Sequence, residues 1–85
     1  SKTVDTTIDK LLSLERDHAR RELVRIEQHL HAFEAQYRLP SEEFYRRFQA
    51  GALGDAADMF EWSAFYQMWQ SVEEQLATLG SEASG

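Results

Sequence analysis

The sequence contains no cysteine, a single proline and four glycines. The absence of cysteine excludes a disulfide framework, a thiolate zinc site and a cysteine nucleophile. Long apolar runs are also missing. No stretch approaches the roughly 18 unbroken apolar residues of a membrane span, and no segment has the layout of a signal peptide. The sequence therefore predicts a cytoplasmic protein that does not enter a membrane.

The chain has 85 residues, of which 42% are apolar, and a formal net charge of -6. A chain of this length allows one small domain, 1–85, whose core stabilises it only marginally. Residues 80–85 carry no large apolar side chain, and we expect them and residues 1–5 to fray at the ends of this domain.

Three helix breakers, Pro40, Gly51 and Gly54, divide the chain into two long segments and a short one between them. In the first long segment every apolar step from Ala19 onward is three or four residues, and the second long segment repeats the same steps from Trp62. This is the period of an amphipathic helix. The predicted helices cover about residues 7–38, 41–50 and 56–79.

Local signals mark where these helices begin and end. The run Thr6-Thr7-Ile8-Asp9 fits a capping box at the start of the first helix, and Pro40 disfavours helical geometry at Leu39 and so ends it. Ser41 is expected to cap the short helix, and Gly51 is expected to end it in a left-handed conformation.

These elements predict an all-α fold. Two long helices joined by a short connecting helix most simply form an antiparallel helical hairpin, with the short helix packed at its closed end. The aromatic residues are concentrated between Phe44 and Trp69. We therefore expect the densest packing at the closed end.

The two long helices differ in length. Laid antiparallel, the helix at 56–79 would cover the first helix only back to about residue 15. The uncovered turns carry four large apolar residues: Ile8, Leu11, Leu12 and Leu14. A monomer rarely exposes such a patch, so we expect a second copy or a different protein to cover it. Two hairpins that pair into a four-helix-bundle dimer would bury it.

The apolar face of the second long helix is also wider than one partner helix can cover. Met59, Tyr66 and Met68 broaden it, and Phe60 projects nearly opposite Phe65 at 100° per residue. Residues 55–85 hold six acidic groups and no Lys or Arg. Such a helix repels nucleic acid and anionic membranes and favours a basic protein surface.

These observations give one set of candidate residues for binding a partner protein or a second copy. They are Ile8, Leu11, Leu12, Leu14, Phe60, Glu61, Tyr66 and Met68.

The polar residues predict no enzyme. Glu15 and His18 match the Glu-x-x-His element of di-iron bundles, but His18 lies roughly 100° from the centre of the apolar stripe. No serine inside a helix has a histidine and an acid converging on it. We therefore expect no catalytic residue, no metal site and no cofactor.

Three runs within residues 37–69 carry a resemblance to known proteins. They are Tyr37-Arg38-Leu39-Pro40-Ser41-Glu42-Glu43-Phe44-Tyr45-Arg46-Arg47-Phe48, Gly51-Ala52-Leu53-Gly54-Asp55, and Glu61-Trp62 followed by Tyr66 and Trp69. In these runs the chain resembles small bacterial and archaeal helical proteins described as antitoxins of type II toxin–antitoxin pairs. The resemblance implies an inhibitor that binds a small, basic toxin with nuclease activity. Nothing in the chain looks like the separate DNA-binding part that many antitoxins carry, which leaves repression of an operon undecided.

The leading hypothesis is a non-enzymatic protein-binding module of this antitoxin-like kind. It would use the acidic face of the second long helix and the uncovered leucines of the first. The alternative is a homo-oligomeric helical bundle without a toxin partner, in which two copies bury the uncovered residues against each other.

Overall fold

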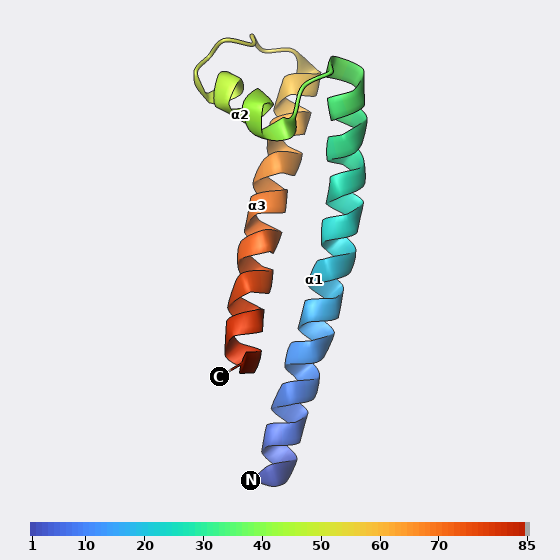
Figure 1. Ribbon diagram of the computed structural model, residues 1–85, viewed down its shortest axis with the longest axis vertical. Helices are drawn as coiled ribbons and strands as arrows, with labels where there is room; N and C mark the ends of the chain where they lie inside the picture. The colour runs from blue at the N-terminus through green and yellow to red at the C-terminus, as the bar shows by residue number, and fades with distance from the viewer. Residues whose placement is uncertain (85) are drawn as a thin grey trace.

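The computed structural model describes the backbone of residues 1–84 and the side chains of residues 1–80. Its elements are α1 (Lys2–Tyr37), α2 (Ser41–Gln49) and α3 (Ala57–Ser84), and residues 1–84 contain no strand. The predicted all-α class is confirmed. α1 and α3 lie side by side and run in opposite directions, and α2 packs near the end at which they are connected (Figure 1). The molecule is a rod of 56 × 21 × 17 Å.

α1 begins at Lys2, whereas the sequence predicted a start near residue 7. The Ser1 hydroxyl accepts a hydrogen bond from the backbone N–H of Val4 at 3.3 Å and caps the helix. The threonines of the predicted capping run instead donate their hydroxyls to carbonyls one turn earlier. The start of α1 at Lys2 was not predicted, because its cap depends on the single polar residue Ser1, which leaves no periodic pattern in the sequence.

α3 also extends further than predicted. It continues beyond Leu79 through Gly80 to Ser84, so it ends later than the predicted residue 79, while Gly85 lies outside the described residues. A glycine costs about 1 kcal/mol in a helix relative to alanine, and it ends the helix only where the backbone turns left-handed. Gly80 does not adopt a positive φ.

The junction between α1 and α2 uses different caps from those predicted. Arg38 follows α1 in the left-handed region at φ 53° and ψ 49°, and its N–H donates to the Glu34 carbonyl. Pro40, not Ser41, occupies the N-cap position of α2. The Glu34 carboxylate accepts the Ser41 N–H at 2.9 Å, and so provides the side-chain acceptor that Pro40 lacks.

The α2–α3 connection turns at two glycines with positive φ, Gly51 at 75° and Gly54 at 76°. The N–H of Gly51 donates to the Phe48 carbonyl at 3.0 Å. The prediction that Gly51 is left-handed is confirmed, although α2 ends at Gln49 and α3 begins at Ala57, each one residue from the predicted position.

The buried core lies at the closed end, as the distribution of aromatic residues predicted. Its buried members come from all three helices: Ile26, Leu30, Phe44, Met59 and Trp62. Trp62 lies at its centre, stacked against Phe33, Tyr37 and Phe44. Since α2 contributes Phe44 to this stack, burial of these rings holds α2 against the two long helices.

Three side-chain hydrogen bonds fix the register of the long helices. They join Tyr37 to Asp58, Trp69 to Glu27 at 3.2 Å, and Gln75 to Glu15 at 2.9 Å. With its extension to Ser84, α3 accompanies α1 further than residue 15, the limit predicted from the sequence. α1 nevertheless extends past the end of α3, so an uncovered stretch remains, although a shorter one (Figure 1).

Candidate functional site

The first candidate surface is an apolar strip near the N-terminus of α1. Its members are 49% to 60% exposed, and we call them the N-terminal strip: Val4, Ile8, Leu11 and Leu14. Leu12, a fifth candidate, is only half-buried. Leu12 lies seven residues before Ala19 and fourteen before Ile26, both of which are buried. Because residues seven apart share one face of a helix, Leu12 lies on the face of α1 that packs against α3.

Val4 is the member that sequence reasoning missed. The sequence predicts a helix only from about residue 7, which leaves Val4 outside it. A helix that begins at Lys2 instead puts Val4 one turn before Ile8 on a common face. The exposed apolar surface of α1 therefore extends one turn further toward the N-terminus than the sequence predicted.

The candidates on α3 do not form one surface. Phe60 is 55% exposed and Met68 is 39% exposed, and both line the same groove. Glu61 is exposed but does not line this groove. Tyr66 is half-buried and belongs to a different pocket on the opposite flank of α3.

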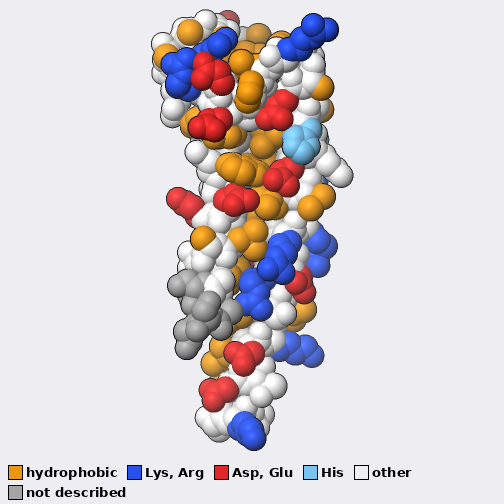
Figure 2. Space-filling model, viewed as in Figure 1, with side chains coloured by type: hydrophobic (Ala, Val, Ile, Leu, Met, Phe, Trp, Pro, Cys, Tyr) orange, Lys and Arg blue, Asp and Glu red, His pale blue; other side chains and the backbone are white. Residues whose placement is uncertain are grey.

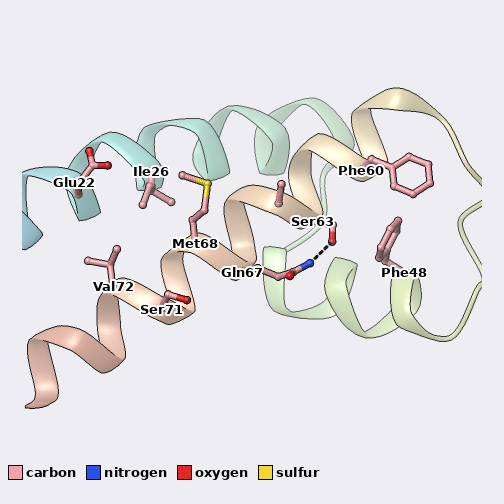
Figure 3. Close-up of a pocket in the computed structure, with 10 residues that line it drawn as sticks. Glu22, Ile26, Phe48, Phe60, Ser63, Gln67, Met68, Ser71 and Val72 are labelled. Atoms are coloured by element: carbon pink, nitrogen blue, oxygen red, sulfur yellow. Dashed lines mark hydrogen bonds between the residues drawn. The ribbon is translucent and has the colours of Figure 1, made fainter.

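The groove has a volume of ≈ 590 Å³ and runs from the seam between α1 and α3 to α2 (Figure 3). Phe48 and Phe60 stand at its α2 end, with ring centroids 5.6 Å apart and ring planes at 87°. Between them and Val72, the Gln67 amide donates to the Ser63 hydroxyl at 3.1 Å. The charged residue of the lining, Glu22, is paired with Arg25 at 2.9 Å. The groove is therefore apolar and nearly uncharged.

The second pocket has a volume of ≈ 260 Å³ and is formed by all three helices. α1 contributes Glu27, Leu30, His31 and Glu34, the start of α2 contributes Pro40, Ser41 and Glu42, and α3 contributes Tyr66 and Trp69. We call it the acidic pocket. Sequence reasoning did not find it, because its walls come from segments far apart in the chain.

Two of the three carboxylates in the acidic pocket accept a single hydrogen bond each. Glu27 accepts the Trp69 indole N–H at 3.2 Å, and Glu34 accepts the backbone N–H of Ser41 at 2.9 Å. Burial, together with the negative charge of Glu42, raises the pKa of the Tyr66 hydroxyl above its ordinary value. The field in this pocket is therefore negative.

The polar residues considered for catalysis or metal binding are dispersed. Glu15 accepts a hydrogen bond from Gln75, and His29 stacks on Phe65 with ring centroids 4.1 Å apart. Within the described residues, no group of three or more His, Cys, Asp or Glu side chains is placed to hold a metal ion. The same part of the chain contains no helix with the length and apolarity needed to cross a bilayer.

The chain was compared with models of protein families, with curated proteins and with solved structures, and none of these matches it significantly.

Proposed function

We propose that this chain is a cytoplasmic, non-enzymatic protein-binding module that masks a basic partner protein, as the antitoxins it resembles mask their toxins. The N-terminal strip carries this proposal. Full burial of a large apolar side chain contributes about 1.5–3 kcal/mol, so covering four half-exposed ones offers roughly 3–6 kcal/mol. That is a substantial part of the free energy of a micromolar complex, about 8 kcal/mol.

The charge distribution supports a basic partner. Residues 55–85 contain six acidic groups and no Lys or Arg, so α3 contributes a negative field. Such a field attracts a positively charged surface over about 8–10 Å at physiological salt and accelerates association. Apolar contacts at the N-terminal strip would then slow dissociation.

Co-expression with the product of the neighbouring gene, followed by size-exclusion chromatography, tests the proposal. We expect a complex with the wild-type chain and none with Leu11→Asp/Leu14→Asp. The matched control is Val24→Asp, because Val24 is 56% exposed on α1 but lies on a different face from Leu11. The proposal is wrong if a basic neighbour forms no complex, or if Val24→Asp weakens the complex as much as the double variant.

A homodimer is the second candidate, and the same strip favours it. Two copies of the α1–α3 hairpin could pair through their strips in a two-fold arrangement and form a four-helix bundle. Light scattering of the purified chain would then give twice the 9.9 kDa mass of one chain. Leu11→Asp/Leu14→Asp would return it to one chain mass. A dimer in isolation that binds no basic neighbour would favour this candidate over the first.

A further inference from the structure

The acidic pocket has aromatic walls. Tyr66 and Trp69, one turn apart on α3, have ring centroids 5.8 Å apart and planes inclined by 22°. Tyr45 of α2 lies against Tyr66 at 4.8 Å, and Leu30 adds apolar surface from α1. Aromatic faces carry the negative part of the ring quadrupole and attract cations.

The carboxylates of this pocket are not neutralised by the chain itself. Ion pairs at other sites involve Asp17, Glu22 and Glu43. Among the described side chains, none forms an ion pair with Glu27, Glu34 or Glu42. No Lys or Arg lines the pocket. Figure 2 shows acidic side chains around hydrophobic surface between the upper halves of α1 and α3.

The dimensions and chemistry of the pocket select its occupant. Its ≈ 260 Å³ is less than the roughly 300–1,000 Å³ of pockets for drug-sized ligands, and so suits a group the size of one side chain. Aromatic faces next to carboxylates bind organic cations. A planar guanidinium can stack on a ring and also donate two parallel hydrogen bonds to a carboxylate, which an ammonium group cannot do.

We propose that the acidic pocket, which is lined by the rings of Tyr66 and Trp69 and by the carboxylates of Glu27, Glu34 and Glu42, binds an arginine side chain of the basic partner. This deepens the proposed function and rests on it for the source of the arginine. The N-terminal strip would supply apolar contact area, and the pocket would supply selectivity for a basic surface.

The binding of arginine can be tested on the isolated chain. The probe is N-acetyl-arginine methylamide, and the readout is the tryptophan indole N–H signal of Trp69 in a nitrogen–proton NMR spectrum. Trp69 donates this N–H inside the pocket, and the backbone N–H of Val4, which donates to Ser1 at the N-terminal end of α1, serves as an internal reference. We expect a saturable shift of the Trp69 signal with a Kd on the order of 1–10 mM, because a single side chain makes few contacts and therefore binds weakly.

Two further probes test the cation and its shape. The lysine analogue should bind several-fold more weakly than arginine, and the neutral citrulline analogue, which keeps the planar end group, should not bind measurably. Absence of a saturable Trp69 shift with arginine would overturn the proposal, and so would equal binding of citrulline. Tighter binding of lysine than of arginine would overturn the choice of arginine.

Charge-removing variants provide the site test. Glu27→Gln/Glu42→Gln keeps an acceptor for the Trp69 N–H. It should weaken arginine binding about tenfold, because each of the two partly exposed charge pairs that it removes contributes about 0.2–1 kcal/mol. Asp5→Asn/Asp9→Asn removes the same charge from exposed positions far from the pocket and should change binding less than twofold. Equal effects of the two double variants would overturn the assignment to this pocket.

The same variants separate this inference from the proposed function. If Glu27→Gln/Glu42→Gln binds the basic neighbour like the wild type while Leu11→Asp/Leu14→Asp does not, the arginine pocket is wrong and the protein-binding function stands. If arginine binds as described but no basic neighbour forms a complex, the pocket stands as a cation site and the proposed function fails.

Discussion

The indole ring of Trp62 stacks on the phenyl ring of Phe44 with ring centroids 3.8 Å apart and planes inclined by 5°. Both side chains are fully buried, and they belong to α3 and α2. The indole N–H also donates to the hydroxyl of Ser41, the first residue of α2, at 2.9 Å. One residue of α3 therefore holds α2 through stacking and through a buried hydrogen bond.

Removal of this stack should destabilise the whole fold. Phe44→Ala should lower the free energy of unfolding by about 3–5 kcal/mol, because it leaves a cavity at a site that all three helices enclose. Small domains have about 5–15 kcal/mol in total, so the variant should lose much of its stability. Urea unfolding followed by circular dichroism measures the change.

The exposed phenylalanine of α3 is the control for this change. Phe60 loses the same side-chain atoms in Phe60→Ala, but it is 55% exposed and contacts Phe48 only at the edge of the fold. We expect a loss of about 1 kcal/mol or less. Similar losses for Phe44→Ala and Phe60→Ala would contradict the position of the core.

The ion pairs of Glu43 should give the fold an acid-sensitive contribution. Hydrogen bonds from Arg46 and then Arg47 lower the pKa of the Glu43 carboxyl from 4.5 to about 2. Because the folded pKa is the lower one, the ionised form stabilises the fold above pH 4.5. This contribution is lost as the pH falls from 4.5 through about 2. It should be modest, since both ion pairs are exposed to solvent.

A carbon NMR titration of the Glu43 carboxyl measures this pKa directly. We expect a midpoint near 2 in the wild type, and a midpoint that rises toward 4.5 in Arg46→Ala/Arg47→Ala. Arg20→Ala removes a cation that pairs loosely with Asp17 at 3.9 Å, and it should leave the Glu43 midpoint unchanged. A midpoint that stays near 2 without Arg46 and Arg47 would show that another group sets it.

Two glycine substitutions should have opposite effects on stability. A Cβ added at Gly51 or at Gly80 meets nothing within 4 Å, so neither change is opposed by crowding. Gly51 has a φ of 75°, which costs an alanine about 1 kcal/mol, so Gly51→Ala should destabilise. Gly80 lies inside α3, so Gly80→Ala should stabilise by about 0.5–1 kcal/mol. Melting temperatures of both variants measure the difference in sign.

The local features of this fold were predictable from the sequence. Pro40 and Gly51 separate the helices where expected, because a missing N–H and a left-handed turn are properties of single residues. The start of α1 and the end of α3 were not found. Ser1 caps a first turn without apolar periodicity, and residues 80–84 carry no large apolar side chain to mark them as helical, although their backbone is helical.

The acidic pocket could not be predicted, because its parts meet only in three dimensions. Glu27 and Trp69 are 42 residues apart in the chain, and the hydrogen bond between them depends on the register of α1 against α3. The width of the apolar stripe alone predicts that Tyr66 belongs to a partner-binding face. In the structure α2 lies beside it, through Tyr45, and makes it a pocket wall.

The uncovered turns of α1 should also be the least stable part of the fold. Turns without a neighbouring helix gain little from tertiary packing, and short helical segments are marginal by themselves. In the isolated single chain, amide hydrogens of residues 6–10 should therefore exchange through openings of near zero free energy. Amides of residues 23–33, which pack at the core, should exchange only near the global free energy of unfolding.

Binding of a second copy or of a basic partner to the N-terminal strip should slow exchange at residues 6–10 specifically, and Leu11→Asp/Leu14→Asp should abolish this slowing. Strong protection of residues 6–10 in a chain shown by light scattering to be single would mean that the strip needs no partner for its stability, and would remove the main support for a binding role.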